Sequence, residues 1–240
     1  MLISSDLHIH TLRSGHAFNT IDECVKKAAE MQLKCIGISD HGPTMEGAPH
    51  LGYFEVLSRL PEYICGVETF YGCEANILDI DGTIDVSDEI CDLLNYVMAG
   101  LHKRTPYNYN SCCDNTKAII KTMQSRKVHI ISHPFRNEFP VDIYDIVHCA
   151  KENNIILEIN KVVFVSAAKR KDKVLIEELI KMLALIKETQ TMCLFGSDAH
   201  YISEMGINQD EWDLMDNCFN ISQIKFINDE INVYLKNKKV

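Results

Sequence analysis

Histidine side chains that can bind a metal ion are concentrated near the start of this sequence, in the segment DLHIHTLRSGH. If this segment begins as a strand, the alternation of side chains places His8 and His10 on one face, and His16 lies on the loop that follows. Leu7 and Ile9 are then expected on the opposite face, where they can pack against helices. Two imidazoles on a face outside the apolar core indicate a metal site.

Short apolar or β-branched runs recur along the chain: LISSDLHIH, KCIGISDH, TFYGCEANI, YVMAGLH, HIISHP, IILEIN and MCLFGSD. Helical patterns separate these runs: TIDECVKKAAEMQL, LGYFEVLSRLPEYI, SDEICDLL, NTKAIIKTMQSR, DIYDIVHCAKEN and KDKVLIEELIKMLALIKET. This alternation predicts an α/β fold with seven parallel strands joined by right-handed crossovers. Such strands form either an open doubly wound sheet or a closed barrel.

The residues at the strand ends favour the barrel, because the carboxyl ends of all barrel strands meet at one mouth. Six of the seven predicted strands end in a residue that can bind metal. The candidate ligands are His8, His10, His16, His41, Glu74, His102, His133, Asp198 and His200. The remaining histidines, His50 in a predicted loop, His129 at a strand start and His148 in a helix, are expected to lie outside the site.

The number and type of these ligands predict a polynuclear site. Nine ligands exceed the four that one tetrahedral ion takes, and they suit two or three ions if the Glu74 carboxylate bridges two of them. Imidazoles with a few carboxylates and no thiolate favour zinc, with manganese or iron next. Such a site predicts hydrolysis of a phosphate ester by a metal-bound hydroxide, although two zinc ions would also support amide hydrolysis.

The composition favours one domain over residues 1–240 and a small substrate. The chain has 240 residues, 46% of them hydrophobic, and no linker-like tract or repeat divides it. A net charge of −10, with only short basic stretches such as the C-terminal KNKK, argues against an extended nucleic-acid partner. We expect a cytoplasmic protein without a membrane span, and we expect most of the ten cysteines to be reduced core or helix residues.

The motifs DLHIHT, ISDHG, ISHP and GSDAH resemble those of the PHP (polymerase and histidinol phosphatase) superfamily. The chain is most similar to the YcdX-like zinc phosphatase subgroup, through SGHAFNTIDE, SDHGPTMEGAPH, GCEANILDIDGTID, AGLHK and LEIN. The resemblance covers nearly the whole chain. It implies a distorted (βα)7 TIM-like barrel that hydrolyses small phosphomonoesters at a trinuclear zinc site, and it suggests a homo-oligomer such as a trimer.

The resemblance also implies a provisional assignment of the ligands to three ions. One ion would take His8, His10, Glu74 and Asp198; a second would take His16, His41 and His200; a third would take Glu74, His102 and His133. All nine positions hold the residue type that the family pattern requires.

Other residues beside the ligand motifs are candidates for supporting roles. The basic residues that could bind phosphate are Arg13, Lys103, Arg136 and Lys161. Lys161 begins a KVV stretch after LEIN, where the subgroup has small polar residues, so the substrate is not carried over from the resemblance. Asp6 and, with greater preference, Asp40 are expected to orient an imidazole through its other ring nitrogen.

Three alternatives to a general phosphomonoesterase stay open. The first is a histidinol-phosphate phosphatase, which performs the same chemistry on one substrate. The second is a phosphodiesterase or exonuclease acting on nucleic acid, which the acidic charge and the lack of basic and aromatic tracts disfavour. The third is a non-catalytic metal-binding protein, which a ligand set at a barrel mouth disfavours.

Overall fold

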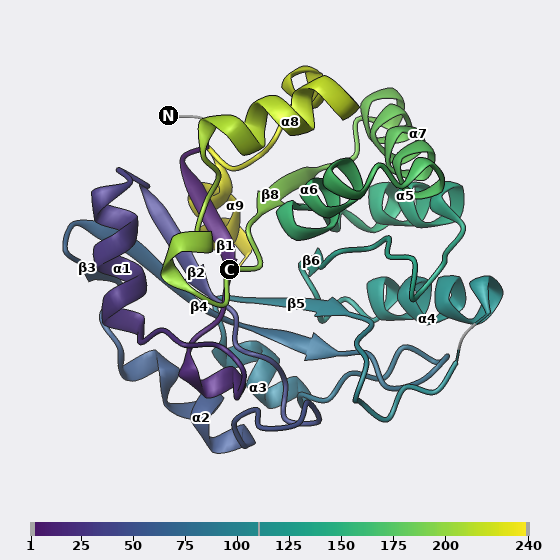
Figure 1. Ribbon diagram of the computed structural model, residues 1–240. Helices are drawn as coiled ribbons and strands as arrows, with labels where there is room; N and C mark the ends of the chain where they lie inside the picture. Colours follow the sequence, from purple (N-terminus) through teal and green to yellow (C-terminus); the bar gives the residue numbers. More distant parts are fainter. Residues whose placement is uncertain (1–2, 110, 239–240) are drawn as a thin grey trace.

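A computed structural model describes residues 3–109 and 111–238, and it shows a parallel sheet nearly closed into a barrel (Figure 1). Within these ranges the strands are β1 (Ser5–Ile9), β2 (Cys35–Ile38), β3 (Tyr63–Ile64), β4 (Val67–Asn76), β5 (Tyr96–Gly100), β6 (Ile130–Ile131), β7 (Ile156–Asn160) and β8 (Cys193–Gly196). Seven of them run parallel in the order β1, β2, β4, β5, β6, β7, β8, and β3 pairs antiparallel with β4. These seven strands lie in the seven apolar runs, so the predicted TIM-like barrel is confirmed.

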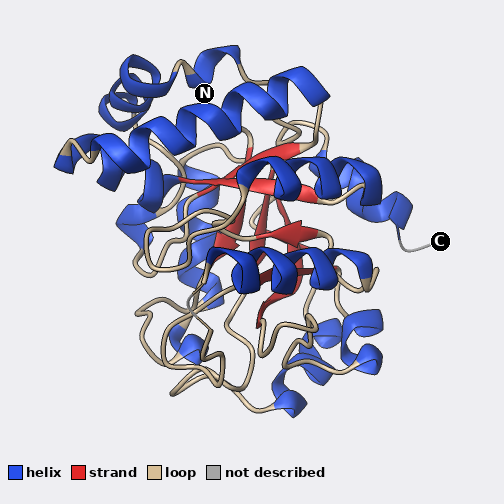
Figure 2. Ribbon diagram, turned by 90° about the vertical axis from the view of Figure 1, so that its right-hand side faces the viewer, coloured by secondary structure: helices blue, strands red, loops and turns tan. Residues whose placement is uncertain are grey.

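Helices surround the sheet (Figure 2). They are α1 (Ile21–Glu30), α2 (Leu51–Val56), α3 (Asp88–Leu93), α4 (Cys112–Gln124), α5 (Ile143–Asn153), α6 (Lys161–Arg170), α7 (Lys173–Thr189), α8 (Gln209–Phe219) and α9 (Ile231–Lys238). Sequence patterns predict six of these and miss α6, α8 and α9. The segment LGYFEVLSRLPEYI is only partly helical, because Pro61 forces Leu60 into extended backbone and the segment then ends in β3.

The first and last strands close the barrel through few contacts. At the carboxyl end, the Ala199 amide donates to the His8 carbonyl at 3.1 Å, and the His10 amide donates to the Ala199 carbonyl at 2.9 Å. At the amino end, the buried Asn228 side chain donates to one carbonyl oxygen of each strand, at 2.9 and 3.0 Å. A buried amide thus replaces the backbone ladder that β1 and β8 lack there.

A register shift in β1 changes the orientation of Leu7. The pairing of β1 with β2 shifts between Asp6 and Ile9, so that β1 carries one extra residue. Leu7 consequently packs inside the barrel, where its carbonyl accepts a bond of 2.6 Å from the Tyr96 hydroxyl. Ile9 packs toward the outer helices as expected. The prediction for Leu7 is wrong because strict alternation does not count a bulge residue.

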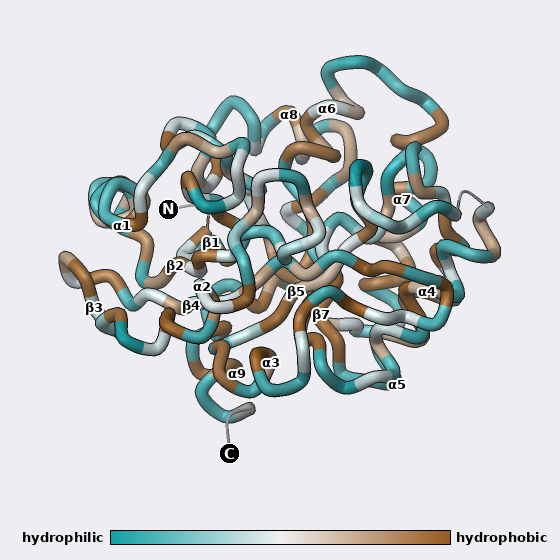
Figure 3. Tube along the Cα trace, turned by 90° about the horizontal axis from the view of Figure 1, so that it is seen from below, coloured by the Kyte–Doolittle hydropathy of each residue, from teal (hydrophilic) through white to brown (hydrophobic). Residues whose placement is uncertain are grey.

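A compact apolar cluster fills the barrel interior at the amino ends of the strands. Its members are Leu7, Cys35, Phe70, Tyr96, Met98, Ile130, Ile156, Leu194, Ile231 and Leu235. The last two come from α9, which therefore covers this end. In Figure 3 the central strands, including β5 and β7, are hydrophobic, whereas long hydrophilic stretches run around the outside.

Most of the cysteines lie in the core or in helices as expected, whereas Cys65 is exposed in a turn. All ten cysteines are unpaired, and six of them are buried. Within the described ranges, no helix is both long and apolar enough to cross a membrane.

Candidate metal centre

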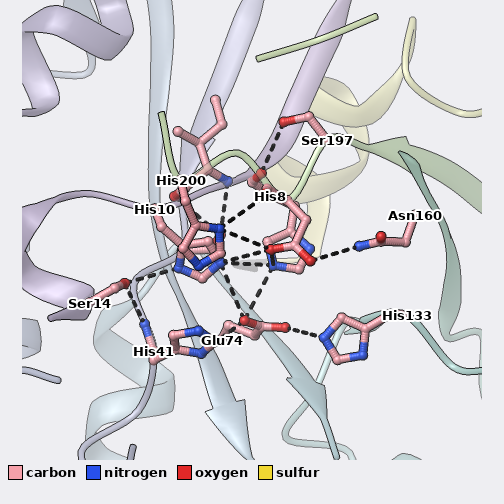
Figure 4. Close-up of polar contacts among 12 residues, drawn as sticks. His8, His10, Ser14, His41, Glu74, His133, Asn160, Ser197 and His200 are labelled. Atoms are coloured by element: carbon pink, nitrogen blue, oxygen red, sulfur yellow. Dashed lines mark hydrogen bonds and ion pairs between the residues drawn. The ribbon is translucent and has the colours of Figure 1, made fainter. Parts of the chain in front are cut away.

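The Glu74 carboxylate, near the end of β4, lies at the meeting point of five imidazoles (Figure 4). The ring nitrogens approach its oxygens at 3.3 Å from His8, 3.4 Å from His10, 3.0 Å from His41, 3.1 Å from His102 and 2.8 Å from His133. All five rings and the carboxylate are buried. Residues from the ends of five different strands, β1, β2, β4, β5 and β6, thus converge as the barrel topology predicts.

Asp198 supplies a second carboxylate, which lies beside the His8 and His10 rings. Its Oδ1 lies 3.4 Å from Nε2 of both His8 and His10 and 3.6 Å from Nδ1 of His200. The Asn160 amide donates to Oδ2 at 3.3 Å. Asp198 adopts a φ of 56°, a backbone conformation that costs energy for a residue with a side chain.

His16 and His200 form the outer edge of the cluster. The His16 ring stacks 5.0 Å from the His41 ring and 4.9 Å from the His200 ring. Gly15 permits this position, because its φ is 82° and a Cβ there would lie 2.5 Å from the Gly47 carbonyl carbon. All nine candidate ligands are therefore brought into one cluster.

In each of three groups of residues, the potential ligand atoms lie within 4.8 Å of one another. They are His8, His10 and Asp198; His10, His41 and His200; and His41, Glu74 and His102. The number of groups equals the number of ions in the provisional assignment, but the membership differs. The first group lacks Glu74, His10 takes the place of His16 in the second group, and His41 takes that of His133 in the third.

Glu158, inside β7, contacts the candidate ligands and was missed by the sequence interpretation. Its Oε1 lies 2.6 Å from His8 Nδ1, and its Oε2 accepts a bond of 2.7 Å from the His133 amide. This second bond holds His133 at a φ of 29°. Glu158 therefore orients one candidate ligand through its ring and another through its backbone. The signal was the acidic residue two positions after Ile156, on the interior face of a buried strand.

The two aspartates expected to orient imidazoles act otherwise. Asp40 accepts a bond of 2.7 Å from the Ser14 hydroxyl, which in turn lies 3.0 Å from His10 Nδ1, so Asp40 reaches the imidazole through Ser14. Asp6 accepts backbone N–H groups, from Ser197 at 3.1 Å among others, and no imidazole. Because of the register shift in β1, Asp6 faces β8, and the prediction for it is wrong.

The two carboxylates of the centre are held in the ionised form. Burial alone would raise the pKa of Glu74, but charge on the neighbouring imidazoles, led by His8 and His102, outweighs burial and holds this pKa well below its usual range. Burial is likewise outweighed at Asp198, where His8 makes the largest contribution to a low pKa. Ionised carboxylates are the form that binds metal.

The pKa values of four of the seven imidazoles, those of His10, His16, His102 and His133, are lowered. Burial and neighbouring imidazoles lower the pKa of His10 well below its usual value. Burial and the charge of Arg136 lower the pKa of His133 to about 3. His8 differs from these four, because the carboxylates around it, led by Glu158, overcome burial and raise its pKa well above the usual value. A cation bound at the cluster would compete with that proton.

The hydrogen bonding of the centre fits metal ions. His8 and His10 face each other with Nε2 atoms 3.1 Å apart, and His102 and His133 do so at 3.2 Å. Buried atoms without a hydrogen-bond partner include Nδ1 of His41 and Oε2 of Glu74, which lie 3.0 Å apart. Facing lone pairs that are buried and unpaired are costly unless a cation lies among them.

Comparison with known sequences matches residues 6–223 to the PHP domain. The chain belongs to the PHP domain family. A protein of Thermoanaerobacter sp. named "Probable phosphatase" is 37% identical over 242 residues, covering 100% of this chain and 97% of its own. A Clostridium botulinum protein of the same name is 37% identical over 237 residues, covering 97% and 94%.

Solved structures resemble this PHP domain in fold. A histidinol phosphate phosphatase of Lactococcus lactis, solved with zinc, L-histidinol and phosphate, superposes with a TM-score of 0.64 at 14% identity, over 93% of this chain and 95% of that one. A chain of an archaeal ribonuclease P bound to mature tRNA reaches 0.56 at 13% identity, over 98% and 89%. At these identities the likeness concerns the fold alone.

The centre of this PHP domain lies at the bottom of a cavity of about 680 Å³. Two of the four predicted phosphate-binding residues line it: Lys103, which pairs with Glu138 at 3.1 Å, and Arg136, whose guanidinium lies 3.6 Å from Asp198. Arg13 does not line this cavity and lies over the ring of Tyr53, 5.4 Å from its centre.

Lys161, the fourth predicted phosphate-binding residue, lies outside the central cavity. It is buried at the start of α6, and its Nζ contacts the Glu204 carbonyl and lies 3.7 Å from the Glu211 carboxylate. It lines a neighbouring cavity that shares Asp198 and His200 with the first. The three histidines expected outside the site, His50, His129 and His148, line neither cavity.

Proposed function

We propose that this PHP domain is a trinuclear metal-dependent phosphatase that hydrolyses small phosphomonoesters. The observation that carries the proposal is the convergence of seven imidazoles and two carboxylates in one cluster, seven of whose nine residues line the central cavity, with the ring nitrogens of His8 and His10 and of His102 and His133 facing each other. The printed names of the similar full-length proteins, probable phosphatases, support the same activity. We further propose that residues 1–240 form one hydrolase domain.

The nine ligands would hold the ions, with zinc as the first choice. Metal ions bound there would acidify a water to a nucleophile and neutralise the phosphoryl oxygens. Among the chain's own groups, Arg136 lies at the cavity wall beside Asp198, where its guanidinium can bind and orient a phosphate. Glu158 and Ser14 hold the His8 and His10 rings in place.

The test is elemental analysis of protein purified without added metal or chelator, together with hydrolysis of an aryl phosphate. We expect two or three zinc, manganese or iron ions per chain and turnover that a chelator abolishes. Asp198→Ala is expected to lose turnover and metal while it stays folded by circular dichroism. Wild-type protein that gains neither ions nor activity on reconstitution would refute the proposal.

A substrate comparison separates this proposal from its nearest alternative. Because the related structure with bound L-histidinol shares the fold but little sequence, histidinol phosphate belongs in the first panel of esters. A kcat/KM for histidinol phosphate far above that for generic esters would assign the narrower activity.

A further inference from the structure

A second cavity of about 560 Å³ opens beside the metal centre. It shares Asp198 and His200 with the central cavity, and α6 forms one of its walls. A third cavity, of about 250 Å³, continues along the same helix and shares Arg136 with the central one. Two cavities thus adjoin the central one along α6, and the second by itself reaches from Asp198 and His200 to Lys169 and Arg170; these adjoining cavities are called the groove below.

One face of α6 supplies the shared lining of the second and third cavities. Val162, Ser166 and Arg170 line both, and their spacing of four residues places them on the same side of the helix. Val162 is about half exposed, an apolar surface on the groove. The helix begins directly after Asn160, whose side chain contacts Asp198. The near end of the groove is thereby fixed at the metal centre, and the far end at Arg170.

The two cations at the far end form no close ion pair in the described part of the chain, although the pKa of Asp172 is lowered by hydrogen bonds from Leu175 and Asn137 and, to a smaller extent, by the charge of Arg170. Lys169 and Arg170 are exposed, and neither forms an ion pair within the described residues. The acidic residues along the groove are already engaged. Glu211 faces Lys161, the Glu204 carboxylate accepts the amides of His200 and Tyr201, and the Asp172 carboxylate accepts from Asn137 and Leu175.

We infer that this groove binds the leaving group of the substrate, and that Lys169 and Arg170 bind a second oxyanion, a carboxylate or a phosphate, at its far end. This inference rests on the proposed phosphatase activity and specifies the substrate class. Arg170 lies eight residues after Val162, which corresponds to roughly 12 Å along the helix at 1.5 Å per residue. The substrate is thus a phosphomonoester with an elongated, partly apolar body and an anionic far end.

The test uses three linear alkyl phosphomonoesters of one chain length, spanning roughly 12 Å by the helical rise of α6. They end in a hydroxyl, a carboxylate or a second phosphate. We expect KM for the anion-ended esters to be about tenfold lower than for the hydroxyl-ended ester, as a charge-assisted hydrogen bond would give. Because the bisphosphate carries two equivalent ester groups, its turnover rate is divided by two before it is compared with the rates of the other esters. The anionic end group, carboxylate or phosphate, that gives the lower KM is assigned as the oxyanion bound at the far end.

The double variant K169Q/R170Q is expected to bring the KM ratio between anion-ended and hydroxyl-ended esters to about one. Because both residues lie in the last turn of α6, where cations also stabilise the helix end, the control is K121Q in the last turn of α4. K121Q is expected to keep the wild-type ratio, and thermal unfolding checks that all proteins are folded.

The outcomes separate the two proposals. Metal-dependent turnover without any preference for an anionic end, or a preference that K169Q/R170Q retains, overturns the groove assignment and leaves the phosphatase standing. Metal-dependent turnover of the aryl phosphate but of none of the three esters also overturns only the groove assignment, whereas no metal-dependent turnover of any of the four compounds overturns both.

Discussion

The two ends of the barrel interior are built from the same strands but have opposite chemistry. β4 contributes Phe70 to the apolar cluster at the amino end and Glu74 to the metal centre at the carboxyl end. β7 likewise contributes Ile156 at one end and Glu158 at the other. In each strand the same alternation of side chains points both residues into the barrel. The position of a residue along the strand therefore determines whether it packs in the apolar cluster or belongs to the metal centre.

Small residues between the two ends make room for the change from apolar to polar side chains. Gly72 lies two residues after Phe70 in β4, and a Cβ there would lie 2.6 Å from the Tyr96 ring. Gly196 in β8 would place a Cβ 2.0 Å from Glu158 Oε1. These glycines thus leave room for two large side chains, Tyr96 in the apolar cluster and Glu158 under the metal centre. The polar end is organised to hold ligands in place, and the apolar end supplies the stability that this requires.

The largest effect is expected at the polar end. Glu74→Gln keeps the side-chain volume but removes the charge that five imidazoles surround, so metal binding is lost. Turnover should fall by roughly a thousandfold or more, as the loss of a centre that stabilises transition-state charge implies. Steady-state kinetics and metal content per chain measure the change, and circular dichroism should report a folded protein.

Glu68→Gln is the matched control for Glu74→Gln, because Glu68 is a buried carboxylate of the same strand at the opposite end. It pairs with Lys236 and Asn232 of α9 and contacts no candidate ligand. We expect wild-type metal content and turnover. If Glu68→Gln lost metal as Glu74→Gln does, the separation between the two ends would not hold.

A stability effect without a chemical one is expected at the apolar end. Leu235, about 2% exposed, packs from α9 into the inner cluster. Leu235→Ala should lower the free energy of unfolding by about 3 kcal/mol, from lost apolar burial and the cavity left behind. Denaturant unfolding of the metal-free protein measures this, while metal content and KM should stay at wild-type values. A change in metal stoichiometry would mean that α9 supports the centre directly.

The same comparison explains what could be predicted from the sequence. The strands and the nine clustered residues follow from local patterns, because hydrophobic runs and a ligand at each run end are visible one segment at a time. The orientation of Leu7 and the position of Asp6 depend on the bulge in β1, which the neighbouring strand imposes. No local pattern contains that information.

Two further features depended on tertiary contacts. Glu158 is one acidic residue among many until the barrel places it 2.6 Å from His8. Lys161 follows the LEIN motif and suggested a phosphate ligand, but α6 turns its ammonium toward Glu211. The β-branched KVVFV stretch conceals this helix, and its Asn160 cap becomes apparent only in the fold.

The smallest effect of the series is expected at Glu158, which lies at the polar end beneath His8 and His133. Glu158→Gln can still accept the His133 amide bond, but it no longer offers a charged partner to the His8 ring. Metal affinity should fall by about 10- to 100-fold, the range typical of residues that orient a ligand. Competition with a chelator of known affinity measures this independently of turnover.

Glu178→Gln, on the exposed face of α7 with a lysine partner, is the control and should keep the wild-type affinity. Glu158→Ala should lose more affinity than Glu158→Gln, because it also releases the strained backbone of His133. Equal losses in the two variants would mean that only the charge on the His8 ring matters. Unchanged metal affinity in both variants would mean that Glu158 does not orient the ligands. Its burial would then result only from the packing of β7 against β8.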